Sequence, residues 1–128
     1  LLGRKRILLV DDNELNLEIE AELFEDLGLF VDRAENGREA LNRITASPAG
    51  TYALVLMDIQ MPVMNGYDAA RAIRALADPL RAQLPIIALS ANAFDEDRRR
   101  SMDSGMNAHL AKPLDMTAFL ELIVSLLQ

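Results

Sequence analysis

Three short and almost uninterrupted apolar runs constrain the fold of this chain more than any other feature. They are RILLVD at 6–11, YALVLMD at 52–58 and LPIIALS at 84–90. Runs of this length without polar alternation are typical of strands covered on both faces, as in a parallel sheet. Weaker runs at 29–34 and 107–112 predict two further strands.

Segments of helical length separate the predicted strands. LNLEIEAEL at 15–23 alternates with the strand period, yet we predict a helix because apolar residues also recur at every fourth position from Leu15 to Leu27. Asn13 can cap this helix and Gly28 can end it. Further helices are predicted at 37–46, 66–77, 94–104 and 115–127. Five strands that alternate with five helices predict an α/β fold with a parallel sheet.

The composition is that of one ordinary domain and argues against several kinds of partner. Of 128 residues, 51% are hydrophobic and 26% charged, which suits a single core. The net charge of −7 and the absence of an apolar run near the ~20 residues that span a bilayer predict no contact of this domain with nucleic acid or membrane. The lack of cysteine favours a reducing compartment, so we expect a cytoplasmic domain, either free or as the cytoplasmic part of a membrane-bound protein. We expect residues 1–5 to be a linker remnant and 6–128 to form the domain.

Polar side chains gather where the predicted strands end. Asp11 and Asp12 follow the first strand, and Asp58, Ser90 and Lys112 end the third, fourth and fifth. In an open parallel sheet, sites form beyond the carboxyl ends of the strands, where the strand order reverses. With the order 2-1-3-4-5 the first and third strands are neighbours. We therefore expect three carboxylates, a hydroxyl and an ammonium group in one crevice.

The three carboxylates predict a site for a cation and for phosphoryl chemistry. Carboxylates this close raise one another's pKa unless a cation neutralises them, and all-oxygen ligands suit Mg²⁺. A carboxylate can also attack phosphorus and form an acyl phosphate. Mg²⁺ and Lys112 would supply the positive charge that phosphoryl oxygens need, and the Ser90 hydroxyl can donate a hydrogen bond to one of them.

Each of these residues alone also has an ordinary structural interpretation. An aspartate at a strand end is most often a helix cap, and a lysine before proline most often lies on the surface. The one histidine, His109, fits a packed or exposed ring. The joint occurrence of these side chains after four strands is what favours a chemical site.

Four stretches, LLVDDNELN, LVLMDIQMPVMNG, PIIALSANA and HLAKP, together resemble the receiver domain of two-component response regulators. The resemblance covers about residues 6–127 and implies a flavodoxin-like fold with strand order 2-1-3-4-5. It implies that Asp58 is the phosphoacceptor and also a metal ligand, Asp12 a direct metal ligand, and Asp11 an acid that acts on the metal mainly through water. The main-chain carbonyl of Gln60 matches the third protein ligand of the metal.

The resemblance also implies which residues bind the phosphoryl group and switch the domain. Ser90 matches the switch hydroxyl, and Ala91 matches the small residue that leaves room for the phosphoryl group. Lys112 matches the site lysine, whose bond to Pro113 is cis in relatives. His109 occupies the switch position at which Tyr or Phe is more usual. A ring that can protonate near neutral pH departs there from the common aromatic switch.

We therefore expect a signalling switch that takes a phosphoryl group from a histidine kinase onto Asp58 with Mg²⁺ and catalyses its own phosphorylation and dephosphorylation. The sequence is most similar to receivers of hybrid sensor kinases, which implies transfer to a histidine phosphotransfer domain. A membrane-bound protein that carries this domain as its cytoplasmic part would then be such a kinase. The expected docking patch beside the first helix consists of Leu15, Ala91, Ala93 and Pro113.

Other functions remain open. A stand-alone or DNA-linked regulator would dimerise on phosphorylation, and a pseudo-receiver would bind partners without phosphorylation, although the complete residue set argues against the latter. A haloacid-dehalogenase-like phosphatase needs a second acid where this chain has Gln60. A flavodoxin-type mononucleotide site needs a Gly- or Thr-rich phosphate loop, but the loop after the first strand is acidic.

Overall fold

The computed structural model describes residues 5–91, 95–112 and 114–127. A five-stranded sheet has the order β2-β1-β3-β4-β5, and every neighbouring pair is parallel. The strands are β1 (Arg6–Val10), β2 (Phe30–Ala34), β3 (Leu54–Asp58), β4 (Ile86–Ser90) and β5 (Ala108–Ala111). This order confirms the predicted flavodoxin-like, doubly wound α/β fold.

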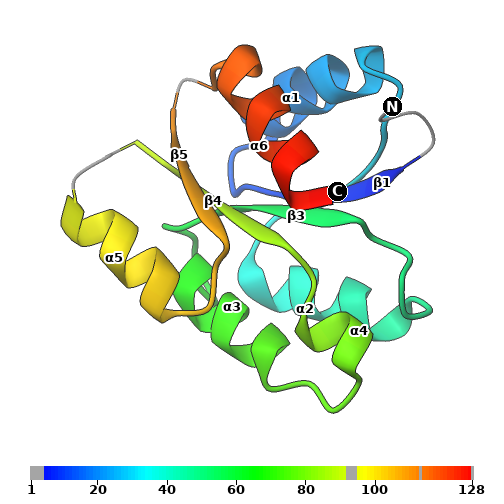
Figure 1. The fold of residues 1–128 in the computed structure, drawn as a ribbon, viewed down its shortest axis with the longest axis vertical. Helices are drawn as coiled ribbons and strands as arrows, with labels where there is room; N and C mark the ends of the chain where they lie inside the picture. The colour runs from blue at the N-terminus through cyan, green and yellow to red at the C-terminus, as the bar shows by residue number, and fades with distance from the viewer. Residues whose placement is uncertain (1–4, 92–94, 113, 128) are drawn as a thin grey trace.

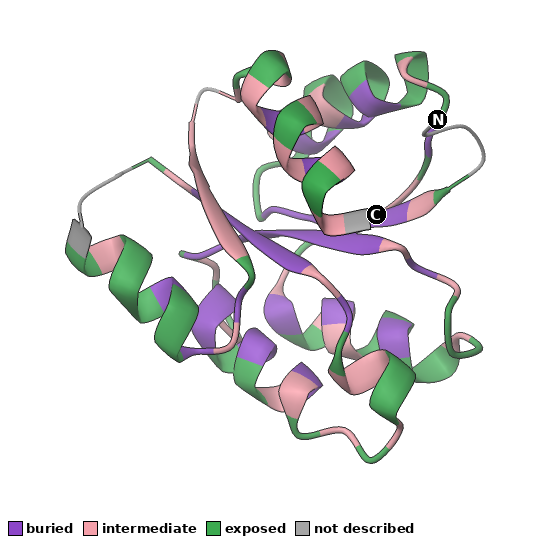
Figure 2. Ribbon diagram, in the orientation of Figure 1, coloured by how far each residue is buried: buried purple, intermediate pink, exposed green. Residues whose placement is uncertain are grey.

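Helices cover both faces of the sheet, with α1 and α6 on one face and α2 to α5 on the other (Figure 1). The helices are α1 (Glu14–Asp26), α2 (Gly37–Ala46), α3 (Gly66–Arg74), α4 (Pro79–Ala82), α5 (Asp95–Asp103) and α6 (Met116–Leu127). None of the described helices has the length and apolar character needed to cross a membrane. Figure 2 shows the buried central strands between the two helical layers.

The apolar runs are buried because successive side chains of a strand point to opposite faces, and both faces are covered here. In β1, Ile7 and Leu9 pack into the core beneath α1 and α6, whereas Leu8 and Val10 pack into the core formed with α2 and α3. All five residues of β3 are buried. The strand that carries Asp58 is therefore held rigidly from both sides.

The first helix forms as predicted, but the apolar row that supported the prediction is not its buried face. Asn13 caps the helix by accepting hydrogen bonds from two main-chain N–H groups, and Gly28 follows it with a φ of 91°. Leu17, Ala21 and Phe24 are buried against the sheet and α6. Of the row at every fourth position, Leu15, Ile19 and Leu23 lie outside, exposed by 62%, 51% and 39%, and only Leu27 is half-buried.

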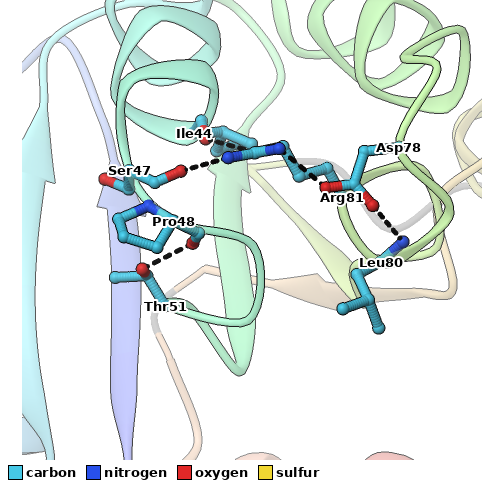
Figure 3. Close-up of polar contacts among 7 residues, drawn as sticks. All are labelled: Ile44, Ser47, Pro48, Thr51, Asp78, Leu80 and Arg81. Carbon is cyan, nitrogen blue, oxygen red and sulfur yellow. Dashed lines mark hydrogen bonds and ion pairs between the residues drawn. The ribbon is translucent and has the colours of Figure 1, made fainter.

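The predicted count of five helices matches the five long ones and missed the short helix α4. Asp78 caps α4 by accepting a hydrogen bond from the N–H of Leu80 at 3.0 Å, and Pro79 stands at its first turn, where no N–H donor is needed. Arg81 then forms an ion pair with Asp78 at 2.7 Å and donates hydrogen bonds to the carbonyls of Ile44 and Ser47 (Figure 3). This side chain joins α4 to the carboxyl end of α2.

Predicted boundaries differ from the observed ones by a few residues. The third helix ends at Arg74 rather than at 77, because the chain turns there. The guanidinium of Arg74 donates hydrogen bonds to the carbonyls of Ala82, Leu84 and Gly105, which joins α3 to the turns before β4 and β5. Four strands begin one or two residues later than predicted, at Phe30, Leu54, Ile86 and Ala108.

Candidate functional site

Three carboxylates meet at the carboxyl ends of β1 and β3. Asp11 and Asp12 follow β1, Asp58 ends β3, and the two strands pair directly, with Val10 opposite Met57. One carboxylate oxygen from each acid lies within 4.8 Å of those of the other two. Asp11 is 1% exposed and Asp58 8% exposed, whereas Asp12 faces solvent. The crevice predicted from the sequence is therefore present.

Main-chain contacts hold Asp11 and Asp58 in place. The Oδ1 atom of Asp11 accepts a hydrogen bond from the N–H of Asn13 at 3.0 Å, which fixes the turn between β1 and α1. Beyond β3, the N–H of Gly66 donates to the carbonyl of Ile59 at 2.8 Å. A Cβ atom at position 66 would collide with the main-chain carbonyl of Asp58, so only glycine lets α3 start this close to the acid.

Lys112 brings positive charge to the acids from the end of β5. Its N–H donates to the carbonyl of Ser90 at 2.8 Å, which continues the pairing of β4 and β5 past Ala111. Its Nζ atom lies 3.0 Å from Oδ2 of Asp11 and 3.6 Å from Oδ2 of Asp58. Burial alone would lower the pKa of Lys112, but the hydrogen bond to Asp11 and the nearby carboxylates outweigh it and raise the pKa. The side chain therefore carries its charge at neutral pH.

The acids repel one another despite Lys112. Burial, with added repulsion from Asp11 and Asp12, raises the pKa of Asp58 to about 6, although the charge of Lys112 opposes the shift. One ammonium thus does not balance three carboxylates. A hard divalent cation fits such a site, because its ligands here would all be oxygen atoms and its charge would remove the remaining repulsion.

The predicted phosphoryl-binding residues line one cleft of about 190 Å³. Its walls are formed by Asp58, Ile59, Gln60, Ser90, Ala91 and Lys112. Gln60 and Ala91 are exposed, and Ser90 is half-buried at the end of β4. A second hollow of about 340 Å³ shares Ile59, Gln60 and Ser90 and extends to Arg100, whose guanidinium lies 4.6 Å from the centre of the Tyr67 ring.

The predicted switch residue His109 does not line that cleft. It lies on β5, and its Nδ1 atom is 3.0 Å from the Oγ atom of Ser101 on α5. The ring is therefore joined to the helix that follows Ser90 in the chain. Ala93, Pro113 and the bond between Lys112 and Pro113 lie outside the described residues.

Glu20 is a fourth acid near the site that the sequence interpretation missed. It belongs to α1, and its Oε2 atom is shielded from solvent and accepts no hydrogen bond from any described residue. Burial and the charges of Asp11 and Asp58 raise its pKa to about 7, while Lys112 opposes the shift. The sequence carries a signal for it, since Glu20 lies three residues after Leu17 and four before Phe24, at the border of the buried face.

A groove of about 510 Å³ runs between α1 and the segment after β5. It is lined by Asn16, Ile19, Glu20, Leu23, Lys112 and Leu114. Two of the exposed apolar side chains of α1, Ile19 and Leu23, line this groove, and Lys112 joins it to the acidic crevice. Leu15 of the predicted docking patch is exposed on α1, and Ala91 is exposed beside the cleft.

Comparisons with known proteins agree with this arrangement. The family model of the response regulator receiver domain matches residues 7–124. The sensor protein GacS of Pseudomonas syringae pv. syringae is 43% identical over 110 residues, which are 85% of this chain and 12% of that protein. The chain spans 5% to 13% of the length of the curated relatives of this kind.

Solved receiver structures are similar over nearly the whole chain. The receiver domain of the sensor histidine kinase PA1611 from Pseudomonas aeruginosa has a TM-score of 0.85 and 34% identity, covers 98% of each chain, and has a magnesium ion coordinated in its active-site cleft. The receiver domain of Ssk1 from Saccharomyces cerevisiae, solved with the histidine phosphotransfer protein Ypd1, has a TM-score of 0.83 and 29% identity and covers 97% of this chain and 89% of that one. The fold, the acidic crevice and the family match together lead to one conclusion: this chain belongs to the response regulator receiver family and is a receiver domain of a two-component system.

Proposed function

We propose that this domain accepts a phosphoryl group from a histidine kinase on Asp58 and passes it to a histidine phosphotransfer domain. Mg²⁺ is held directly by Asp12, Asp58 and the carbonyl of Gln60, and mainly through water by Asp11. The observation that carries the proposal is the convergence of three carboxylates and the Lys112 ammonium at one sheet edge. Asp58 ends β3 at the wall of an open cleft, where an incoming phosphorus atom can reach it.

The reaction forms an acyl phosphate. A carboxylate oxygen of Asp58 attacks the phosphorus of a phosphohistidine, the P–N bond breaks, and its electron pair returns to the imidazole nitrogen. Lys112 and the Ser90 hydroxyl neutralise and hydrogen-bond the phosphoryl oxygens, and Ala91 leaves room for the group. When bound, Mg²⁺ supplies positive charge to the phosphoryl oxygens and keeps the carboxylates ionised.

The exposed apolar row on α1 supports a docking partner beside the site. Ile19 and Leu23 are exposed and line a groove that leads to Lys112, and Leu15 is exposed on the same helix. A partner helix that lies in this groove would bring a histidine ring close to Asp58. Helix-in-groove contacts of this kind are made by apolar residues three or four positions apart. The similarity to receivers of sensor kinases and to a receiver solved with a phosphotransfer protein supports a place in the phosphorelay of a hybrid kinase.

The phosphoacceptor is tested with acetyl phosphate in the presence and absence of Mg²⁺. We expect phosphorylation of the wild-type domain only with Mg²⁺, and none of the Asp58→Asn variant. The exposed residue Asp103 at the end of α5 offers a matched control, since Asp103→Asn makes the same chemical change at a residue that does not line the cleft and should leave labelling intact. Equal labelling of the Asp58→Asn variant and the wild type would refute the assignment.

The relay is tested by mixing the labelled domain with histidine phosphotransfer domains. We expect loss of the label to such a domain within seconds to minutes, and a monomer on size exclusion before and after phosphorylation. The face formed by α5, β5 and α6 is the dimer surface that a stand-alone or DNA-linked regulator would use. Stable phosphorylation-dependent dimers without transfer of the label would refute the relay and support a stand-alone or DNA-linked regulator.

A further inference from the structure

Glu20 is an unusual residue to find at the boundary between α1 and the site. Its Oε2 atom is shielded from solvent, and within the described part of the chain no group donates a hydrogen bond to it. A carboxylate in that position loses hydration without the compensation that a donor would give. Another group near Glu20 must therefore offset part of the free-energy cost of burying this carboxylate.

Among the described residues that line the same groove, Lys112 is the one with a cationic side chain. Its ammonium group already lies between Asp11 at 3.0 Å and Asp58 at 3.6 Å, and Glu20 adds to the charges that keep it protonated. Glu20 thus attracts the ammonium from the α1 side, while Asp11 and Asp58 attract it from the sheet. Lys112 is thus ion-paired with Asp11 and Asp58 and is attracted over a longer distance by Glu20 on α1.

This sharing bears on both ligands of the site. In the function proposed above, the phosphoryl group on Asp58 must take Lys112 as a partner, so an acid that attracts the ammonium group from another side competes with it. The charge of Glu20 also opposes the negative charge that a phosphoryl group brings to Asp58. The same charge favours a cation, because it draws Lys112 from the carboxylates that would bind the metal and adds negative potential.

We propose that Glu20 is a positioning residue of the phosphorylation site that acts through Lys112, strengthening the binding of the divalent cation and weakening the binding of the phosphoryl group. The inference rests on the proposed function of Asp58. Its distinctive consequence is that removal of one charge changes the two affinities in opposite directions. A merely structural role for Glu20 would weaken both together.

The test compares Glu20→Gln with the wild-type domain at pH 8, where Glu20 is ionised. Mg²⁺ is titrated first without fluoride, and beryllofluoride, which stands in for the phosphoryl group, is then titrated at saturating Mg²⁺, both followed by amide chemical shifts. We expect the Kd for Mg²⁺ to rise about three- to tenfold and the Kd for beryllofluoride to fall by a similar factor, the size expected for one charge acting across a partly solvated site.

Two further variants control for folding and for net charge. Glu22 lies on the exposed side of α1, so Glu22→Gln makes the same charge change and should leave both Kd values within about twofold, as expected for a screened surface charge. Glu20→Asp retains the charge and should leave the Kd values for Mg²⁺ and for beryllofluoride close to those of the wild-type domain. Parallel losses in Glu20→Gln, no change, or the same result with Glu22→Gln would overturn the role of Glu20. A wild-type domain that binds neither ligand would instead overturn the proposed function, and the role of Glu20 with it.

Discussion

The Nδ1 atom of His109 lies 3.0 Å from the Oγ atom of Ser101, so a ring on β5 is hydrogen-bonded to the middle of α5. Ser101 is fully buried, and its Oγ atom also lies 3.0 Å from the main-chain carbonyl of Asp97, to which it donates. A hydroxyl group has a single proton. We infer that His109 carries a proton on Nδ1 and donates it to Ser101.

The first prediction concerns this tautomer. In the wild-type domain at pH 9, the ring nitrogen shifts of ¹⁵N-labelled histidine should report protonation at Nδ1, and Ser101→Ala should move the proton toward Nε2 because the acceptor is lost. His109 is the single histidine, so the spectrum needs no assignment by mutation. Ser104→Ala is the matched control, since the Ser104 hydroxyl donates to the Ser101 carbonyl and not to the ring. An unchanged tautomer in Ser101→Ala would contradict the inferred bond.

The second prediction links the same ring to phosphorylation. If Ser90 moves toward the phosphoryl group, β5 moves with it, because the N–H of Lys112 donates to the Ser90 carbonyl and the two strands pair. The bond between Ser101 and His109 must then lengthen or rearrange. Beryllofluoride with Mg²⁺ should therefore shift the ring signals of His109, and amide shifts should extend over α5, β5 and α6. Changes that stay within the loops around Asp58 would count against a switch at this position.

The third prediction separates the two adjacent acids. Both oxygens of Asp11 are engaged, Oδ1 by the N–H of Asn13 and Oδ2 by Lys112, whereas Asp12 faces solvent. Asp12→Ala should therefore reduce Mg²⁺ affinity more than Asp11→Ala. In EDTA, Asp11→Ala should lower the free energy of unfolding by about 2 kcal/mol because it leaves Lys112 without its shortest ion pair. Asp12→Ala should leave stability unchanged or slightly higher, because its charge repels Asp58. Equal or reversed losses of Mg²⁺ affinity, measured by NMR titration, would refute these roles.

The sequence predicted the sheet well because burial on both faces leaves a clear signal. Each of the three main strands is an apolar run, and its end falls within one residue of a polar side chain that the site uses. Since parallel strands end at one edge, the gathering of Asp11, Asp58 and Lys112 followed from the strand order alone. Those contacts depend on main-chain topology, which apolar patterning predicts.

Features that depend on side-chain packing were not predicted. The row from Leu15 to Leu27 has helical spacing, but spacing alone does not tell which of two apolar faces is buried, and α1 buries Leu17, Ala21 and Phe24. Glu20 was missed for the same reason, since its place at the site depends on which face turns inward. The signal for α4 was only the pair Asp78–Pro79, because four residues are too few for a periodic pattern.

The fourth prediction concerns the dependence of stability on pH without metal. The pKa values of Glu20 and Asp58 are raised to about 7 and about 6 in the folded domain, so the folded state holds these protons more tightly than the unfolded chain. The stabilisation is complete below the unfolded pKa values and is lost as pH rises through 6 to 7. In EDTA, Glu20→Gln should therefore gain stability relative to the wild type as pH rises from 5 to 8, as measured by urea unfolding. A difference that is constant over this range would show that Glu20 titrates alike in both states.

The last prediction concerns the exposed row on α1. Ile19 is 51% exposed, so Ile19→Ser removes apolar area from the groove with little loss of packing, and the free energy of unfolding should fall by less than about 1 kcal/mol. Transfer of the phosphoryl group from Asp58 to the histidine of a phosphotransfer domain depends on docking of that domain. If Ile19 is a central contact, the transfer rate at a subsaturating concentration of the partner should therefore fall about tenfold.

Leu80 offers the control for this variant. It is 66% exposed and lies on α4, on the opposite face of the sheet from α1 (Figure 1). Leu80→Ser should leave the transfer rate unchanged, measured with a phosphotransfer domain that accepts the label from the wild-type domain. Labelling by acetyl phosphate should be the same in both variants, because neither residue lines the cleft at Asp58. Equal transfer rates for Ile19→Ser and Leu80→Ser would place the docking surface elsewhere than on α1.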